Sequence, residues 1–382
     1  MKKHYNIIIA GAGGIARAVG LLLAEWSEIS PSIFIGNRTL SKAIKVANWI
    51  KKGTTKKVIV KGFLLPEDGI TNEMEELFYE GSIILDCLPG RFAPRVAKFA
   101  LDFKLHYANL TEYVSETNKI IEFVKNAQTG FILQTGLAPG YINVLGNGLF
   151  KKFCNDYSVD KVNSLKLRVG ALTKHAVAPH YYGFTWSSVG VATEYIKDTF
   201  AIRNFKKVSL PALSERAKII INGITYEEDL TSGGAADLPD SLSGLIESLD
   251  YKTLRYPGHY KWIQQQLSNL GNTQNAILFL QKRMESTIPY IEDDQIILYA
   301  GVEGNDLSGK LRSIEIAKTI EPQIVGNHLL KAIQTTTAAP LAQAAKYLLE
   351  TNPSGVILQS NLNPVKFLEG KFIKSVYGTI DF

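Results

Sequence analysis

The sequence predicts an α/β protein in which a doubly wound parallel sheet precedes a second, α+β domain with a mixed sheet. Three observations support this prediction. Short apolar runs alternate with helical patterns through the first 135 residues, as in parallel sheets. A glycine-rich turn joins the first apolar run to the first helical pattern. After residue 140, strand-like segments alternate apolar and polar residues, the period of half-exposed strands.

The expected elements of the first domain follow the chain in regular alternation. Six strands are predicted at residues 5–10, 32–35, 57–65, 82–88, 106–110 and 130–134. Helices are predicted at residues 39–52, 91–103 and 115–128, besides the one that follows the glycine-rich turn. Ligands of such a sheet bind beyond the carboxyl ends of its strands, so the segments after each strand are the first places to look for a site.

Composition excludes several classes of function. The chain has 382 residues, 46% hydrophobic and 20% charged, with a net charge of +6. Its basic residues are dispersed, so no nucleic-acid partner is expected. Two cysteines without a Cys/His cluster indicate neither a metal site nor a disulfide framework. No apolar stretch reaches the roughly 18 residues of a membrane span, and we expect a cytoplasmic protein.

The glycine-rich turn reads Gly11-Ala12-Gly13-Gly14-Ile15-Ala16, between a predicted strand and a predicted helix. This is the GxGxxA pattern of Rossmann dinucleotide-binding domains in its required context. Gly11 permits the tight turn, Gly13 lets the pyrophosphate approach the backbone, and Ala16 allows close packing of helix on strand. The helix start then offers N–H groups to the phosphates.

The end of the second strand bears on the choice of cofactor. An NAD site normally places an acid here to bind the ribose 2′-hydroxyl, but the sequence reads Gly36-Asn37-Arg38-Thr39. The Arg38 guanidinium suits a 2′-phosphate. We therefore favour NADP, with NAD as the second choice; alternatively, Arg38 is an exposed residue at a helix start. The predicted cofactor-binding residues are Gly11, Gly13, Gly14, Ile15, Ala16, Asn37, Arg38, Thr39, Leu88, Pro89, Gly90 and Gly136.

The second half has a different architecture. Strands are predicted at residues 162–169, 218–224 and 294–302, and a loop rich in His, Pro and Tyr at 173–183. A helical pattern covers residues 328–350.

Several motifs give the chain a resemblance to a known family. They are GAGGIA at 11–16, GNRTLSKA at 36–43, DCLPGRFA at 86–93, NLTEY at 109–113, GLAPG at 136–140, RVGAL at 168–172, YGFTWSSVG at 182–190, PALSE at 211–215 and YKTLRYPGH at 251–259. Along nearly its whole length the chain resembles the saccharopine dehydrogenase-like oxidoreductases. GLAPG is more similar to lysine 6-dehydrogenases, whereas Asn37-Arg38 is more similar to the NADP-using saccharopine reductases.

The resemblance implies a domain organisation and a reaction. Residues 1–135 would form the dinucleotide-binding domain, 136–325 a substrate-binding and dimerisation domain, and 326–370 helices returning to the first. The implied protein is a homodimer that transfers hydride at a C–N bond of a lysine-like amino acid. The alternatives are a carboxynorspermidine-type polyamine reductase and a catalytically silent NADP(H)-binding sensor.

This reaction needs a cation for the substrate carboxylate and an acid or base near the amine. Arg255, in the TLRYPGH run, is the first choice for the cation, because a guanidinium grips a carboxylate through two hydrogen bonds. Arg91 is the second, and either could instead form a structural salt bridge.

For proton transfer we choose His259, whose imidazole titrates near neutrality, although it could instead pack behind Pro257 and Gly258. Tyr113 and its neighbour Glu112 are alternatives. Glu194 could bind the substrate ammonium, or else cap an arginine; on one helix it would lie about two turns from Trp186, on a similar face. Weaker candidates for covering the substrate are His175 and His180, while Trp186 and Tyr182 are expected to pack the core.

Overall fold

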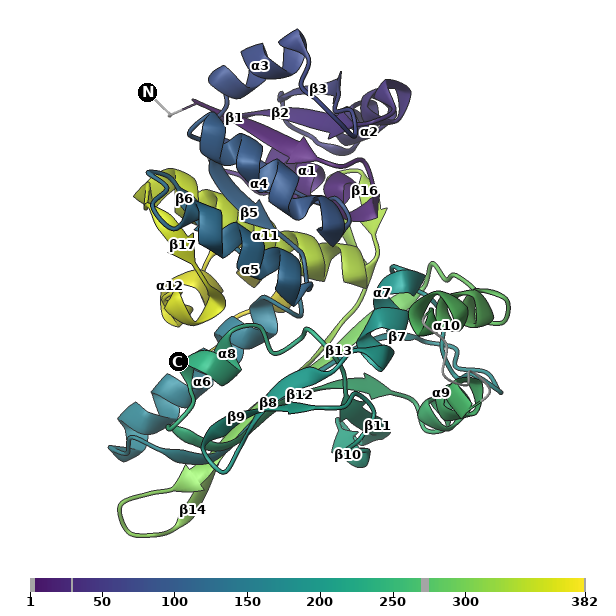
Figure 1. Cartoon of the computed structure of the whole chain (residues 1–382), viewed down its shortest axis with the longest axis vertical. Coiled ribbons are helices and arrows are strands. Elements are labelled where there is room, and N and C mark those ends of the chain that lie inside the picture. Colours follow the sequence, from purple (N-terminus) through teal and green to yellow (C-terminus); the bar gives the residue numbers. More distant parts are fainter. Residues whose placement is uncertain (1–3, 29, 269–274, 381–382) are drawn as a thin grey trace. The chain divides into compact units, whose positions relative to one another are not determined.

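The chain folds into two compact units in a computed structural model that describes residues 4–28, 30–268 and 275–380 (Figure 1). Unit 1 contains the described residues up to Tyr141, together with Gln323–Leu330 and those from Gln334 onward. Unit 2 contains Ile142–Pro322 and Lys331–Ile333. The C-terminal part of the chain thus returns to the N-terminal fold.

Unit 1 is built on a parallel sheet whose strand order is β17-β6-β5-β4-β1-β2-β3. The strands are β1 (His4–Ala10), β2 (Ser30–Asn37), β3 (Ile59–Leu64), β4 (Ile83–Asp86), β5 (His106–Asn109), β6 (Gly130–Ile132) and β17 (Gly355–Ile357). The order reverses between β1 and β4, the switch point at which dinucleotides bind in such sheets. The doubly wound sheet is confirmed, but the prediction of six strands was wrong. The seventh, β17, is too short to show a period in the sequence.

Helices cover both faces of this sheet. They are α1 (Gly14–Trp26), α2 (Leu40–Gly53), α3 (Asn72–Tyr79), α4 (Ala93–Asp102), α5 (Val114–Val124), α11 (Ala332–Thr351), α12 (Pro364–Leu368) and α13 (Lys371–Tyr377). One core joins Ile8, Ile84 and Tyr107 of the sheet to α3, α4 and α5. On the other face, α1 packs against α2, and the carbonyl of Leu349 in α11 accepts a hydrogen bond from the Tyr5 hydroxyl.

The predicted helix at 328–350 begins later than expected. His328–Leu330 form a short strand, β16, which pairs with β15 (Gln323–Val325), and α11 starts only at Ala332. The His328 ring stacks on Trp49 with 4.1 Å between ring centroids. This tertiary contact, together with the pairing of β15 and β16, holds an apolar segment extended that by itself has a helical pattern.

Unit 2 is built on a mixed sheet with the order β10-β11-β12-β7-β13-β14, to which β8 and β9 add beside β12. Its strands are β7 (Val162–Thr173), β8 (Thr199–Arg203), β9 (Lys206–Leu210), β10 (Ala217–Ile221), β11 (Ile224–Leu230), β12 (Ile246–Arg255), β13 (Asp294–Asn305) and β14 (Leu311–Ile320). Its helices are α6 (Tyr141–Tyr157, whose first residue belongs to unit 1), α7 (Ser188–Ile196), α8 (Leu238–Ser241), α9 (His259–Ser268) and α10 (Ala276–Glu285). Among the described strands of this sheet, only β7 and β12 pair in parallel, which confirms the mixed sheet.

The single strand predicted at 218–224 is instead a hairpin. Asn222 and Gly223 have φ values of +51° and +80°, the backbone conformation of a tight two-residue turn. The turn separates β10 from β11, and Ile221 pairs with Ile224 across it.

A buried ion network crosses the sheet of unit 2. The guanidinium of Arg168 on β7 forms hydrogen-bonded salt bridges with Glu228 on β11 and Asp250 on β12, each at 2.6 Å. Burial alone would raise the pKa of Asp250, but Arg168, Lys252 and Arg203 outweigh it and lower that pKa. The network therefore depends on its cations to keep the buried Asp250 carboxylate charged.

Two features are absent from residues 4–28, 30–268 and 275–380. No helix in this part of the chain combines the length and apolar character that crossing a membrane requires. In the same residues, no group of three or more His, Cys, Asp or Glu side chains is arranged to hold a metal ion.

Candidate functional site

The glycine-rich turn follows β1 directly, and its first residue has to be glycine. Gly11 has a φ of +118°, and its N–H donates to the carbonyl oxygen of Gly36 at 2.8 Å. A Cβ here would lie 3.0 Å from the carbonyl oxygen of Cys87. Both the backbone angle and the contact exclude side chains, so Gly11 fixes the approach of β1, β2 and β4 at the switch point.

Gly13 leaves the start of α1 open. Its backbone is extended, with a φ of −85°. Apart from Gly13 and its two chain neighbours, no heavy atom of the described residues lies within 4 Å of the position of a Cβ. Within those residues, no side chain caps α1 and no acid occupies its first turn. The helix therefore presents N–H groups and the positive end of its dipole to an anion, while Ala16 is fully buried.

A residue from far along the chain also borders this turn. The Gln334 side-chain amide of α11 donates to the carbonyl oxygen of Gly14 at 3.4 Å, and its nitrogen lies 3.0 Å from the position of a Gly14 Cβ. No local sequence signal predicts this contact, because 320 residues separate the partners.

Gly13→Val tests the role of the open turn. A valine fits the extended backbone, so unit 1 should stay folded, with a loss of about 1 kcal/mol at the helix cap. Its methyl groups would fill the space that the pyrophosphate needs, so NADPH and NADH should both bind at least about 100-fold more weakly. Cofactor titration by fluorescence, beside thermal unfolding, measures both effects; binding within threefold of wild type would contradict this role. Gly13→Ala should give an intermediate loss.

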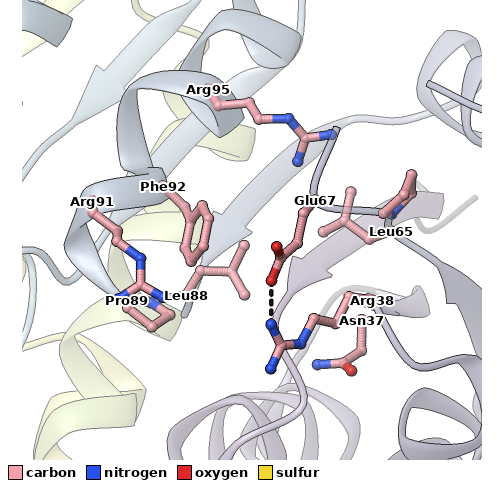
Figure 2. Close-up of a pocket in the computed structure, with 10 residues that line it drawn as sticks. Asn37, Arg38, Leu65, Glu67, Leu88, Pro89, Arg91, Phe92 and Arg95 are labelled. Atoms are coloured by element: carbon pink, nitrogen blue, oxygen red, sulfur yellow. Dashed lines mark hydrogen bonds and ion pairs between the residues drawn. The ribbon is translucent and has the colours of Figure 1, made fainter. Parts of the chain in front are cut away.

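A pocket of 190 Å³ lies beyond the carboxyl ends of β2, β3 and β4 (Figure 2). Its lining residues are Asn37, Arg38, Leu65, Pro66, Glu67, Leu88, Pro89, Arg91, Phe92 and Arg95. Five of the sequence-predicted site residues are among them. The sequence reasoning missed Glu67, whose carboxylate forms an ion pair with the Arg38 guanidinium. Thr39 lies beside the pocket, where its N–H donates to the Asn37 side-chain oxygen at 3.0 Å.

The pocket wall formed by residues 88–91 rests on a buried acid. Asp86 accepts the Leu88 N–H and the Tyr107 hydroxyl, both at 2.9 Å. Burial raises the pKa of Asp86 to about 7, although these two hydrogen bonds oppose the shift. Asp86 is thus a positioning residue for the loop, and the sequence shows it only as an acid in an apolar strand.

The next two strands complete the carboxyl edge. A Cβ on Gly90 would lie 2.3 Å from the Thr111 hydroxyl and 2.7 Å from the Tyr113 ring, so the loops after β4 and β5 touch at this glycine. Gly136, beyond β6, donates its N–H to the carbonyl oxygen of Pro139 at 2.8 Å. Arg91 lies over the Phe92 ring at 4.6 Å. These candidates therefore gather on the carboxyl side of the unit 1 sheet.

Asp86→Asn tests the buried acid through pH. The folded chain keeps the Asp86 proton up to about pH 7, whereas an unfolded Asp releases it near ~3.9. The unfolded state therefore binds fewer protons between these values, and wild-type stability falls relative to the variant by about 3 kcal/mol as pH rises from 4.5 to 7.5. Urea unfolding of unit 1 at both pH values measures this difference. Asp102→Asn, at an exposed acid on α4, should show no such slope.

In unit 2, Arg255 ends β12 inside an aromatic layer. It is 1% exposed, and its guanidinium carbon lies 4.7 Å from the centre of the Tyr182 ring and 5.6 Å from that of Tyr195. Its Nε donates to the Tyr195 hydroxyl at 2.7 Å and its Nη1 to the carbonyl oxygen of Leu254 at 2.9 Å. Arg255 is thus a buried cation held by the Tyr195 hydroxyl and by the backbone of its own strand.

His259 begins α9 and continues this chain of hydrogen bonds. Its Nδ1 donates to the carbonyl oxygen of His180 at 2.6 Å, which leaves Nε2 to accept the Tyr195 hydroxyl at 3.0 Å. His259 is fully buried; burial and the charge of Arg255 lower its pKa to about 3. A neutral imidazole with both nitrogens engaged orients Tyr195, so the geometry favours the packing alternative over direct proton transfer.

The structure also places the other candidates of unit 2. Glu194 lies on α7 next to Tyr195 and interacts electrostatically with Arg255. Trp186 and Glu194 do not lie on one helix, because α7 begins only at Ser188. Tyr182 and Trp186 do pack the core. His180 is 5% exposed, whereas His175 is exposed, 3.8 Å from Asp293.

Comparison with protein families decides the assignment. Residues 7–131 match the saccharopine dehydrogenase NADP binding domain, and residues 136–370 match the saccharopine dehydrogenase C-terminal domain. The chain belongs to the saccharopine dehydrogenase family. It is therefore a member of a family of NAD(P)-dependent oxidoreductases, as the sequence motifs predicted, and its unit 1 is of the nicotinamide-binding type.

Two solved structures share the fold. The saccharopine dehydrogenase (L-Glu forming) of Saccharomyces cerevisiae has a TM-score of 0.76 at 16% identity, with 98% of each chain covered. The homospermidine synthase of Legionella pneumophila, in complex with NAD, has a TM-score of 0.71 at 14% identity, covering 99% of this chain and 91% of that one. At these identities the likeness shows that the three proteins share a fold.

Proposed function

We propose that this protein transfers hydride between NADP(H) and the carbon of a C–N bond in a lysine-like amino acid, as a saccharopine reductase or a lysine 6-dehydrogenase. The observation that carries the proposal is the buried Arg255 guanidinium between Tyr182 and Tyr195. A cation held at 1% exposure is suited to gripping a carboxylate, because the pair is weakly screened by water.

The residues of unit 1 fit a nicotinamide dinucleotide. The open space at Gly13 can admit a pyrophosphate, and Arg38, Arg91 and Arg95 line the pocket beside it. When bound, the cofactor supplies the hydride chemistry at its nicotinamide ring. The protein supplies binding, orientation and charge.

In unit 2, each residue of the aromatic layer has a role in the proposal. Arg255 binds the substrate carboxylate, and Glu194 attracts the ammonium group. Tyr195 orients Arg255 through its hydroxyl, and neutral His259 holds that hydroxyl in place.

In the oxidative direction the substrate loses a hydride from carbon and a proton from nitrogen, so the C–N single bond becomes C=N. Water then adds to give a carbonyl and an amine. Tyr113 is the remaining candidate to accept that proton, and Arg91 is the alternative clamp.

A substrate panel tests the reaction. Reduced-nicotinamide absorbance is followed with lysine, with saccharopine, and with α-aminoadipate semialdehyde plus glutamate. Turnover in at least one of these supports the proposal. Turnover restricted to aspartate semialdehyde plus a diamine would identify a polyamine reductase instead, and tight cofactor binding without any turnover would identify a sensor.

The preference for NADP has its own test. We expect wild-type protein to bind NADPH about tenfold more tightly than NADH, because Arg38 lies at the end of β2, where the 2′-phosphate is read. Arg38→Met should abolish the difference while NADH affinity changes less than twofold. Equal wild-type affinities for the two cofactors, measured by isothermal titration calorimetry, would contradict the preference.

A further inference from the structure

The pocket beside β2 contains an acid at the place where the sequence shows none. Glu67 comes from the loop between β3 and α3, some thirty residues after Arg38. Among the ten lining residues, all within the described chain, it is the one carboxylate, facing three arginines. Figure 2 shows its carboxylate turned toward Arg38, with Arg95 on the opposite side of the pocket.

The ion pair between Glu67 and Arg38 is exposed and weak enough for another anion to replace the carboxylate. The two side chains are 50% and 66% exposed, and exposed pairs of this kind stabilise a fold very little. A stronger anion can therefore replace the carboxylate. Arg95 does not take the place of Arg38 as the partner of that anion, since its Nη2 donates to the carbonyl oxygen of Gly69 at 2.8 Å.

We propose that Glu67 sets the cofactor selectivity of this protein by acting as an internal anion on Arg38, which a ribose 2′-phosphate has to displace. The inference rests on the proposed use of NADP. The carboxylate holds the Arg38 guanidinium over the pocket, yet it also neutralises Arg38 and repels a phosphate. NAD lacks that phosphate and leaves the pair intact. Glu67 thus lowers the affinity for NADP but not that for NAD. It thereby reduces the preference for NADP over NAD that Arg38 creates.

Binding of NADPH and NADH to four proteins tests this selectivity: wild type, Glu67→Gln, Arg38→Met and the double variant. Glu67→Gln should tighten NADPH about five- to twentyfold, from loss of a like charge a few ångströms from the phosphate, and should change NADH less than twofold. In the Arg38→Met background the gain should shrink to the part that repulsion between Glu67 and the phosphate contributes, because Glu67 then has no guanidinium to occupy. The gain should also shrink as salt screens the charges.

Glu76→Gln is the matched control. It removes the same charge from an exposed position on α3 that does not line the pocket, and it should alter both affinities by less than twofold. An unchanged NADPH/NADH ratio in Glu67→Gln, or an equal shift in the Glu76 variant, would overturn the inference. So would selective weakening of NADH by more than threefold, since Glu67 would then bind ribose hydroxyls.

This outcome is separable from that of the proposed function. The wild-type ratio of NADPH to NADH affinity reports the cofactor preference, and the substrate panel reports the reaction. The inference concerns only the change in that ratio caused by Glu67→Gln. A wild-type protein without NADP preference would refute the cofactor proposal, while an Arg38-dependent gain in NADPH affinity would still support the role of Glu67.

Discussion

Arg255→Met is expected to lower kcat/KM by about 100- to 1000-fold while the affinity for NAD(P)H stays within twofold of wild type. The methionine has similar length but neither charge nor donors, so a substrate carboxylate would lose two charge-assisted hydrogen bonds, each worth roughly 1.5–3 kcal/mol. Stopped-flow turnover and cofactor titration on the same preparation measure the two quantities. Because Arg255 belongs to unit 2 and the glycine-rich turn to unit 1, the two readouts are independent.

Two further variants make this result specific to the proposed clamp. Arg312→Met carries the same substitution to an arginine of β14 that is 44% exposed and pairs with Asp306, and it should leave kcat/KM unchanged. Arg255→Lys keeps the charge but not the paired donors and should recover part of the activity. Normal turnover in Arg255→Met, or loss of its cofactor binding, would refute the clamp; thermal unfolding shows whether the variant is folded.

Arg168→Met is expected to destabilise unit 2 by about 3–5 kcal/mol, the cost of removing one partner from a buried ion pair. Arg168 is 3% exposed in its side chain, and its partners Glu228 and Asp250 are 9% and 11% exposed. Without the guanidinium, two buried carboxylates remain. Asp250 then has Arg203 at 2.8 Å, and Glu228 has Lys252 at 3.8 Å. Hydrogen exchange of peptides from β7, β11 and β12 during urea titration measures the loss in unit 2.

An exposed pair in unit 1 provides the control. Lys98 and Asp102 lie one helical turn apart on α4, with side chains 57% and 48% exposed, and Lys98→Met should cost less than about 0.5 kcal/mol. If the triple variant Arg168→Met, Glu228→Gln, Asp250→Asn is as unstable as Arg168→Met, the loss comes from packing and not from unpaired charge.

Much of the fold of unit 1 was predictable because its signals are local. A buried parallel strand favours a continuous apolar run, and β1 (HYNIIIA) and β4 (IILD) each contain one. The turn between β1 and α1 needs glycine at residue 11 for its backbone angle, so the residue type reveals the conformation. By contrast, β17 and β16 are three-residue strands that exist only because a partner strand lies beside them.

The candidate site divides in the same way. Arg38, Leu88, Pro89 and Arg91 were predicted, and the structure places them around one pocket. Their position follows from strand order, since every strand end in a parallel sheet points to the same edge. Glu67 was missed because the expected acid was sought directly after β2, and the structure supplies one from a different loop.

His259 shows a second limit. Its residue type and its place in TLRYPGH suggested an acid/base, because a free imidazole titrates near neutrality. Whether it can do so depends on burial, on the charge of Arg255, and on which groups meet its two nitrogens. None of these has a signature within the motif.

By itself, then, the sequence determined the doubly wound sheet, the glycine-rich dinucleotide turn and the family, because these depend on backbone angles and apolar periods that neighbouring residues set. The tertiary structure alone decided that Glu67 meets Arg38, that Gln334 borders the turn, and that Arg255, Tyr195 and His259 form one hydrogen-bonded chain. These contacts join segments distant in sequence, and their charges and pKa values depend on burial, which exists only once the chain has folded.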